Sequence, residues 1–277
     1  MTNSLEGRSI VVTGGGTGLG AACARIAARE GAAVTICGRT VSKLDAIAEA
    51  IRADGGRITA IAADVTVEAD VQRLVSTAVD FGGGALHGVV ANAGGGGALA
   101  PLHLQSPDEF MRVLQLNVVG TLLCVKHSVP HLAAAGGGSF VAMSSIAGHV
   151  THPFFGAYTA GKAGVDSLIR NAADEYGKYK VRFNAVQPGF ISTEMMEGIR
   201  RGGPIWNSYV DQTPLGGVGE PDDVAHLVRF LLSDESRWVT GTSIPIDGGH
   251  FLRRGPDFTA TVERLVGADR LDPRSAL

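Results

Sequence analysis

The amino-acid sequence predicts an α/β fold: a doubly wound parallel sheet of about seven strands with helices on both faces. Two observations lead to this prediction. Short β-branched or apolar runs alternate along the chain with longer segments whose apolar residues recur at helical spacing. The short runs are apolar on both faces, which is typical of parallel strands that are covered by helices on each side.

The expected strands are short and evenly distributed along the chain. In order they are SIVVT, AAVTIC, RITAIAAD, LHGVVAN, GSFVAMSS, VRFNAVQP and GTSIPID. Because helical segments separate them, successive strands are expected to be joined by crossovers and to run in the same direction.

The expected helices carry capping residues at several ends. Gly31 suits the C-terminal cap of the first helix, and Thr66 is expected to cap the helix in VEADVQRLVSTAV. Ser106 and Pro107 open a long helix toward residue 133, and a further helix runs from about Tyr158 to Tyr179. The segments VSKLDAIAEAIRA and PDDVAHLVRFLLSD supply two more.

Length and composition predict a single domain over residues 1–277. A chain of 277 residues with 45% hydrophobic residues can bury one substantial core, and neither a proline-rich linker nor an internal repeat divides it. The glycine clusters at 82–84, 94–97 and 136–138 fall between elements and are interpreted mainly as flexible loops.

Charge and residue spacing exclude several classes of partner. The net charge is -3 without a basic run, so nucleic acid is not an expected partner. Cys23, Cys37 and Cys124 are widely separated and lack CxxC spacing, which indicates buried reduced thiols. His149 and His152 have no partners at metal-ligand spacing, so no metal site is expected. The polar start MTNSLEGRS and the lack of a long apolar run predict a cytoplasmic protein with no membrane partner.

The stretch VVTGGGTGLGAACARIAARE passes from a strand through a glycine-rich turn into a helix. Gly14, Gly18 and Gly20 lie at this first crossover of the expected sheet. Backbone N–H groups and the positive dipole end of the helix can hold a phosphate there when no side chain blocks its approach. The turn therefore predicts a dinucleotide or another phosphate-bearing ligand.

The spacing T-G-x-x-x-G-x-G resembles the form found in the short-chain dehydrogenase/reductase family. Further stretches match that family in the same order: NAG at 92–94, Asn117 within a long helix, Ser145 placed 13 residues before Tyr158, and Lys162 in YTAGK. PGFIST at 188–193 and DGG at 247–249 extend the resemblance, which covers roughly residues 7–250. It implies a Rossmann-like fold and an NAD(P)-dependent oxidoreductase that interconverts a ketone and a secondary alcohol.

Tyr158 and Lys162 also suggest acid–base chemistry on residue type and spacing alone. They are four residues apart in an expected helix and so share one face. An ammonium group beside a tyrosine favours the phenolate, so Lys162 is expected to lower the pKa of Tyr158. Ser145 ends a central strand, where active sites of α/β proteins collect.

The resemblance implies a role for each member of the catalytic set. Tyr158 would pass a proton to or from the substrate oxygen, and Ser145 would donate a hydrogen bond to that oxygen. Lys162 would hold the ribose hydroxyls, and Asn117 would orient a water that links Lys162 to solvent.

The resemblance also implies a cofactor-binding set. Asp64 would accept a hydrogen bond from the adenine amino group, and Asn92 would hold the strands around the adenosine. Thr193 and the backbone near Ile191 would contact the nicotinamide amide, whereas Thr13 braces the turn. The complete set is Gly14, Thr17, Gly18, Leu19, Gly20, Arg39, Asp64, Val65, Asn92, Ala93, Gly94, Tyr158, Lys162, Pro188, Gly189, Ile191 and Thr193.

The end of the second strand favours NADP(H), with NAD(H) as the alternative. Gly38 occupies the position where an acidic residue would bind the ribose of NAD, and Arg39 and Lys43 follow it. An arginine there can bind a 2′-phosphate through two hydrogen bonds or stack on the adenine of either cofactor. Positions 15 and 16 are both glycine, so the turn lacks a second basic residue.

The segments that flank the active-site motifs predict a small to medium, mostly hydrophobic substrate. Arg200 and Arg201 either meet an anionic group of the substrate or lie in solvent, and His149 and His152 would line the entrance. The apolar residues expected around the pocket are Phe154, Phe155, Met195, Met196, Ile199 and Trp206.

Three other functions remain as alternatives. An enoyl reductase of similar fold carries its lysine seven residues after the tyrosine, and that position is Val165 here. Sugar-nucleotide epimerases of the family carry G-x-x-G-x-x-G and a larger C-terminal domain. A dinucleotide-binding protein without turnover is the third alternative, against which the intact catalytic set argues.

Residues 250–277 extend beyond the usual end of the family and carry spaced apolar residues. Members of the family usually form homotetramers, or homodimers, with the last strand at an interface. We therefore expect the tail to pack across a subunit interface, with Arg253 or Arg254 paired to an acidic group. The alternative is a tail that folds back on its own subunit. The apolar residues are Phe251, Leu252, Phe258, Val262, Leu265, Val266 and Leu271.

Overall fold

A seven-stranded sheet, parallel throughout, forms the centre of the molecule in a computed structural model that describes residues 4–196, 198–253 and 255–276. The strand order is β3-β2-β1-β4-β5-β6-β7, which confirms the predicted doubly wound sheet. The strands are β1 (Ser9–Thr13), β2 (Ala33–Gly38), β3 (Arg57–Ala62), β4 (Gly88–Ala91), β5 (Gly138–Met143), β6 (Val181–Pro188) and β7 (Ser243–Ile246).

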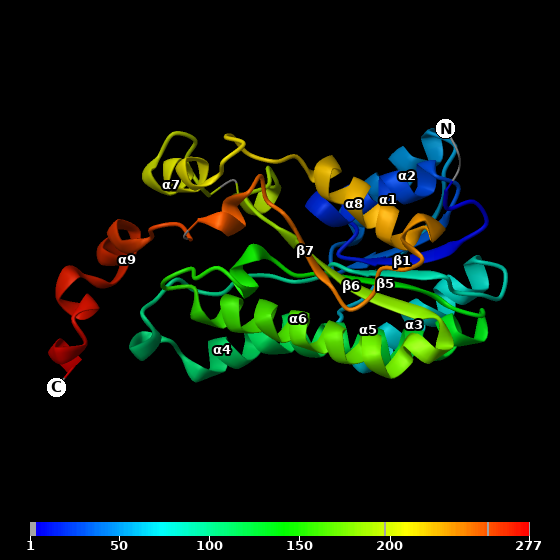
Figure 1. The fold of residues 1–277 in the computed structure, drawn as a ribbon, viewed down its shortest axis with the longest axis horizontal. Coiled ribbons are helices and arrows are strands. Elements are labelled where there is room, and N and C mark those ends of the chain that lie inside the picture. Colours follow the sequence, from blue (N-terminus) through cyan, green and yellow to red (C-terminus); the bar gives the residue numbers. More distant parts are fainter. Residues whose placement is uncertain (1–3, 197, 254, 277) are drawn as a thin grey trace.

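Helices cover both faces of the sheet (Figure 1). One face carries α1 (Gly18–Arg29), α2 (Val41–Ala53) and α8 (Pro221–Leu232). The other carries α3 (Glu68–Phe81), α4 (Pro107–Leu114), α5 (Gly120–Ala134) and α6 (Gly156–Tyr176). Both interfaces are apolar because strand residues alternate between them: Ile10, Val12 and Ile36 pack on the α1 side, and Phe140 and Phe183 stack at 5.1 Å on the α6 side.

The sheet order reverses between β1 and β4, which both end at the same edge of the sheet. Crevices at such reversals are where open α/β sheets bind ligands. Two further helices, α7 (Pro204–Gln212) and α9 (Thr259–Val266), lie beyond one end of the sheet (Figure 1, left). The β6 strand leads directly toward α7, so this end is the carboxyl edge of the strands.

Three helix boundaries differ from the sequence prediction. The long helix opened by Ser106 is interrupted by a π turn over Gln115–Val119. Thr66 does not cap α3; its hydroxyl instead donates to Asp64 at 2.7 Å, and Val67 precedes the first helical residue. The helix predicted over about Tyr158 to Tyr179 is α6, which begins at Gly156 and ends at Tyr176 before a short 3-10 turn.

All three cysteines are free and buried, as predicted. Burial raises the pKa of Cys23 and Cys37 to about 12, because a thiolate would lose its hydration there. In the described part of the chain, the helices are too short or too polar to cross a membrane.

Candidate active site

A groove follows the carboxyl edge of the sheet across the reversal between β1 and β4. It consists of a larger cavity of about 460 Å³ and a smaller one of about 250 Å³. The two share Gly14, Thr17, Ala93 and Gly94, so they form one continuous channel. Of the predicted site residues, all but Gly20 and Asn117 line this channel.

The glycine turn between β1 and α1 has the backbone that a phosphate site requires. Gly14 and Gly18 adopt φ values of 64° and 49°, which side-chain-bearing residues rarely take. The first turn of α1 contains no acidic residue, and the Thr17 side chain makes no cap hydrogen bond with the helix. The positive end of the helix is therefore uncompensated and faces the channel.

Asn92 and Thr13 hold the two central strands together at this turn. The Asn92 amide donates to the Thr13 carbonyl at 2.9 Å, and the Thr13 hydroxyl accepts from the N–H groups of Asn92 and Ala93 at 3.0 and 2.9 Å. Gly20 supports the same turn from behind, since an added Cβ would overlap the Gly14 carbonyl. Asn92, Thr13 and Gly20 therefore shape the turn.

Tyr158, Ser145 and Lys162 come together at the end of β5. Ser145 follows that strand by two residues, and its side chain is hydrogen-bonded to Tyr158. Lys162, on the next turn of α6, is 5% exposed and donates to the Met143 carbonyl at 2.7 Å. Its Nζ lies 5.5 Å from the centre of the Tyr158 ring. The three side chains predicted from the sequence thus share one end of the channel.

Burial dominates the protonation of this group. It raises the pKa of Tyr158 above its ordinary value, although the hydrogen bond from Ser145 partly opposes the rise. It also lowers the pKa of Lys162 to about 8, against the attraction of the Asp166 carboxylate one turn further on. The pKa of Tyr158 is therefore raised, not lowered as expected from the neighbouring Lys162, and burial is the main cause.

Asn117 lies beneath the channel at the π turn that interrupts the α4–α5 helix. Its amide donates to the carbonyls of Gly95 and Val113 at 2.8 and 2.9 Å, and its oxygen accepts from the Gly95 N–H. A Cβ added at Gly94 would lie 2.7 Å from the Asn117 oxygen and 3.2 Å from the Lys162 nitrogen. Gly94 is therefore needed for close packing, which corrects the interpretation of this glycine cluster as mainly a flexible loop.

The smaller cavity ends at the second and third strands. Arg39 and Lys43 line it from the β2 side, and Asp64 and Val65 from the β3 side. Lys43 forms an ion pair with Glu194 at 3.8 Å, and the Asp64 carboxylate accepts from Thr66. Arg39 is exposed and makes no hydrogen bond or ion pair with the described residues.

The larger cavity is bounded by the segment after β6 and by mostly apolar side chains. Pro188, Gly189, Ile191 and Thr193 line it, as predicted for the cofactor set. Phe155, Met196 and Ile199 also line it, whereas Phe154 and Trp206 do not; the Trp206 ring packs edge-on against Phe190 at 5.2 Å. The Met195 side chain lies outside the described part. Among the lining residues that sequence reasoning missed are Leu99, Phe190, Tyr209 and Phe258.

Comparison with known proteins agrees with this geometry. A family model described as enoyl-(acyl carrier protein) reductase matches residues 14–250. The cis-4-hydroxycyclohexanecarboxylate dehydrogenase of Sinomonas cyclohexanicum is 38% identical over 251 residues, covering 90% of this chain and 99% of that protein. The chain belongs to the short-chain dehydrogenase/reductase family. It is accordingly an oxidoreductase.

Two further members of the family are similar over most of their length. The 2,5-dichloro-2,5-cyclohexadiene-1,4-diol dehydrogenase of Sphingobium indicum is 35% identical, covering 89% of this chain and 98% of that protein. The solved structure of a short-chain type dehydrogenase/reductase from Mycobacterium ulcerans is 41% identical with a TM-score of 0.94, covering 97% of this chain and 98% of that one. The Mycobacterium ulcerans structure covers 97% of this chain, and the uncovered 3% is shorter than residues 250–277. Part of the C-terminal tail therefore has a counterpart in that structure.

The tail of this short-chain dehydrogenase/reductase packs on its own subunit, as in the alternative weighed from the sequence. Phe258 lines the larger cavity, and the Asp257 N–H donates to Ser208 on α7 at 3.0 Å. Arg253 forms no ion pair within the described residues of this chain, and Arg254 lies outside them. Contact of the tail with a second subunit stays a prediction.

We predict that Gly94→Ala weakens dinucleotide binding. The new methyl group would press on Asn117 and Lys162, and overlap of this kind costs about 1–3 kcal/mol. Fluorescence titration with NAD(P)H, together with the melting temperature, measures the effect. Gly177→Ala is the matched control, because nothing lies within 4 Å of its added Cβ. Equal affinity and stability in both variants would contradict the packing argument.

Proposed function

We propose that this chain interconverts a ketone and a secondary alcohol on a six-membered carbon ring, with NAD(P)(H) as cofactor and Tyr158 as general acid and base. The observation that carries the proposal is the Tyr158–Ser145–Lys162 group at one end of an otherwise mostly apolar cavity. A ring substrate is supported by the names of two relatives, a hydroxycyclohexanecarboxylate dehydrogenase and a cyclohexadienediol dehydrogenase.

Each residue of the group has a distinct part in this proposal. Ser145 donates a hydrogen bond to the substrate oxygen and fixes it beside Tyr158. Tyr158 gives its phenolic proton to that oxygen during reduction and removes it during oxidation. Lys162 binds the ribose hydroxyls, while Asn117 supports the loop at Gly95 and orients a water next to Lys162. The bound dinucleotide supplies or accepts the hydride.

For the cofactor we favour NADP(H), with NAD(H) as the alternative. No acidic side chain ends β2, where Gly38 stands, and Arg39 lines the adenosine end of the channel without a partner among the described residues. Lys43 is already paired with Glu194, which leaves Arg39 as the cation best placed for a 2′-phosphate. The cofactor-binding roles of Asp64, Ile191 and Thr193 are part of the same proposal.

Reduction of a carbon–carbon double bond is the second candidate, because the matching family model carries an enoyl reductase description. The position seven residues after Tyr158 is Val165, a residue of α6 that is 1% exposed and packed in the core between the helix and the sheet. A lysine is therefore absent where that subgroup carries one. Ser145 hydrogen-bonded to Tyr158 instead suits a substrate oxygen.

We also propose a cytoplasmic homotetramer. β7 is the terminal strand of the sheet, so its outer edge has no partner strand within the described chain. Trp238, shortly before this strand, is 90% exposed. A second subunit at this edge would cover both features.

We predict that the wild-type protein oxidises cyclohexanol with NADP⁺ and that Tyr158→Phe abolishes this turnover. Loss of the hydroxyl removes only the proton-transferring atom, so the cofactor affinity of the variant should be nearly unchanged. Absorbance of the reduced cofactor measures the rate, and fluorescence titration measures binding. More than a tenth of the wild-type rate in the variant would contradict the assignment of Tyr158.

We expect the two directions to depend differently on pH. Oxidation needs the phenolate of Tyr158, and burial raises the pKa of this side chain, so kcat/KM for the alcohol should increase from about pH 7 to about pH 10. Reduction needs the neutral phenol, which predominates throughout that range. Steady-state rates with a ring alcohol and its ketone test this. An oxidation rate that stays flat or falls would show that another group titrates.

We expect Arg39→Ala to raise the KM for NADPH far more than that for NADH. A hydrogen-bonded contact with a charged phosphate contributes roughly 1.5–3 kcal/mol, enough to change the preference tenfold or more. Lys43→Ala is the control, since its ammonium is already engaged by Glu194 and a smaller change should result. Equal weakening of both cofactors by Arg39→Ala would indicate stacking on the adenine and favour NAD(H).

A further inference from the structure

The C-terminal tail contributes a side chain to the larger cavity. Phe258 is only 4% exposed and lines the same cavity as Ser145 and Tyr158, which lie 113 and 100 residues earlier in the chain. The tail is therefore part of the wall that a substrate would contact.

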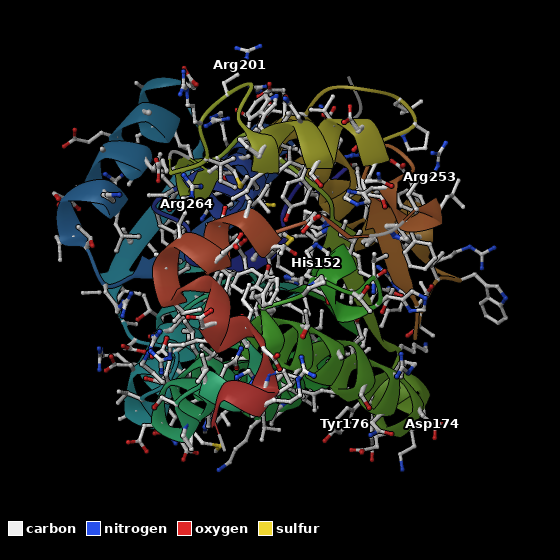
Figure 2. The ribbon with its side chains drawn as sticks, turned by 90° about the vertical axis from the view of Figure 1, so that its left-hand side faces the viewer. His152, Asp174, Tyr176, Arg201, Arg253 and Arg264 are labelled. Carbon is white, nitrogen blue, oxygen red and sulfur yellow. The ribbon has the colours of Figure 1, made fainter. Side chains whose placement is uncertain are left out.

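Contacts with three separate segments hold the tail in this place. A side chain added at Gly255 would overlap the Thr151 carbonyl, so the tail lies directly against the loop that precedes α6. The Asp257 N–H donates to Ser208 on α7, and the Arg270 carbonyl lies 3.2 Å from the His103 ring nitrogen. Figures 1 and 2 show α9 between α7 and the α4 side of the molecule, at the carboxyl edge of the sheet.

The α9 helix presents its apolar stripe inward. Val262, one turn after Phe258, is fully buried, whereas Leu265, nearer the end of the helix, is 65% exposed. Two buried apolar side chains on one face fix the rotation of this short helix, because turning it would expose both to water. Phe258 is therefore held as a rigid wall.

Aromatic contacts link Phe258 to Tyr158 through the ring of Phe155. The Phe155 ring stacks on Tyr158 with a centroid distance of 4.6 Å, and Phe258 packs edge-on against Phe155 at 6.4 Å. Phe258 thus lies one aromatic ring removed from Tyr158. The room between them is limited, because a cavity of about 460 Å³ must also contain the nicotinamide end of the cofactor.

We propose that Phe258 is a specificity-determining residue that limits the length of the substrate. It admits one six-membered ring with a small group opposite the reacting carbon and excludes a bulky group there. The inference rests on the proposed function for its substrate class. It assigns the selection of substrate size to the tail, outside the residues 7–250 on which the family resemblance rests.

The experiment compares cyclohexanol with 4-tert-butylcyclohexanol in the wild type and in Phe258→Ala, Phe258→Leu and Leu265→Ala. Leu265→Ala is the matched control, since it truncates an apolar side chain of the same helix that is 65% exposed and does not line the cavity. Alongside kcat/KM, calorimetry measures the Kd of the two corresponding ketones. The protein is saturated with the oxidised cofactor, with which a ketone does not react. Binding thus reports on the cavity even if turnover fails.

We expect Phe258→Ala to raise the preference for the bulky ring over the plain ring about tenfold or more, with Phe258→Leu intermediate. Leu265→Ala should leave the preference as in the wild type. An unchanged preference in Phe258→Ala overturns the inference, and so does an equal change in Leu265→Ala. Failure of the wild-type protein to bind cyclohexanone also overturns it.

Two results separate this inference from the proposed function. Binding of ring ketones that changes with Phe258 but is not followed by turnover would contradict the proposed function alone. Turnover of cyclohexanol in every variant, with no change in size preference, would contradict the inference alone. If Phe258→Ala does not fold, Phe258→Leu alone decides, and a size preference equal to that of the wild type then overturns the inference.

Discussion

The hydrogen bond from the Lys162 ammonium to the Met143 carbonyl fixes the candidate active site. It is 2.7 Å long and buried, and it ties α6 to the last residue of β5. Ser145 follows Met143 by two residues, and Tyr158 precedes Lys162 by one helical turn, so one contact sets the relative position of all three side chains. A buried lysine is costly unless its donors are satisfied, and this bond supplies part of that compensation together with Asp166.

Glycines provide the space that this arrangement needs. The channel passes over backbone at Gly14 and Gly94, where added side chains would meet Asn92, Asn117 and Lys162. Backbone that comes this close leaves N–H groups and a helix terminus facing the channel, which is the requirement for holding phosphates. The same absence of side chains that resembles flexibility in the sequence is close packing in the structure.

The sequence was sufficient for the sheet, its helical layers and the position of nearly every predicted site residue, because strand–helix alternation and local motifs such as YTAGK depend on neighbouring residues. It was insufficient where the outcome depends on distant contacts. The π turn at Asn117 and the inward face of α9 follow from packing against segments far along the chain. The sign of the Tyr158 pKa shift was also wrong, since burial cannot be read from the spacing of Tyr158 and Lys162. Inward apolar spacing in the tail was the available signal for Phe258.

Two parts of the wall of the larger cavity have different origins in the chain, and this separates chemistry from selection. The reacting end is built from β5 and α6, whose positions are fixed by the sheet and by the buried Lys162. The rest of the wall includes Leu99, Phe190, Tyr209 and, in the tail, Phe258, all of which lie outside the strands. Loops and termini tolerate substitution better than a close-packed sheet does. Substrate size can therefore change through these segments while the geometry of Ser145, Tyr158 and Lys162 is retained.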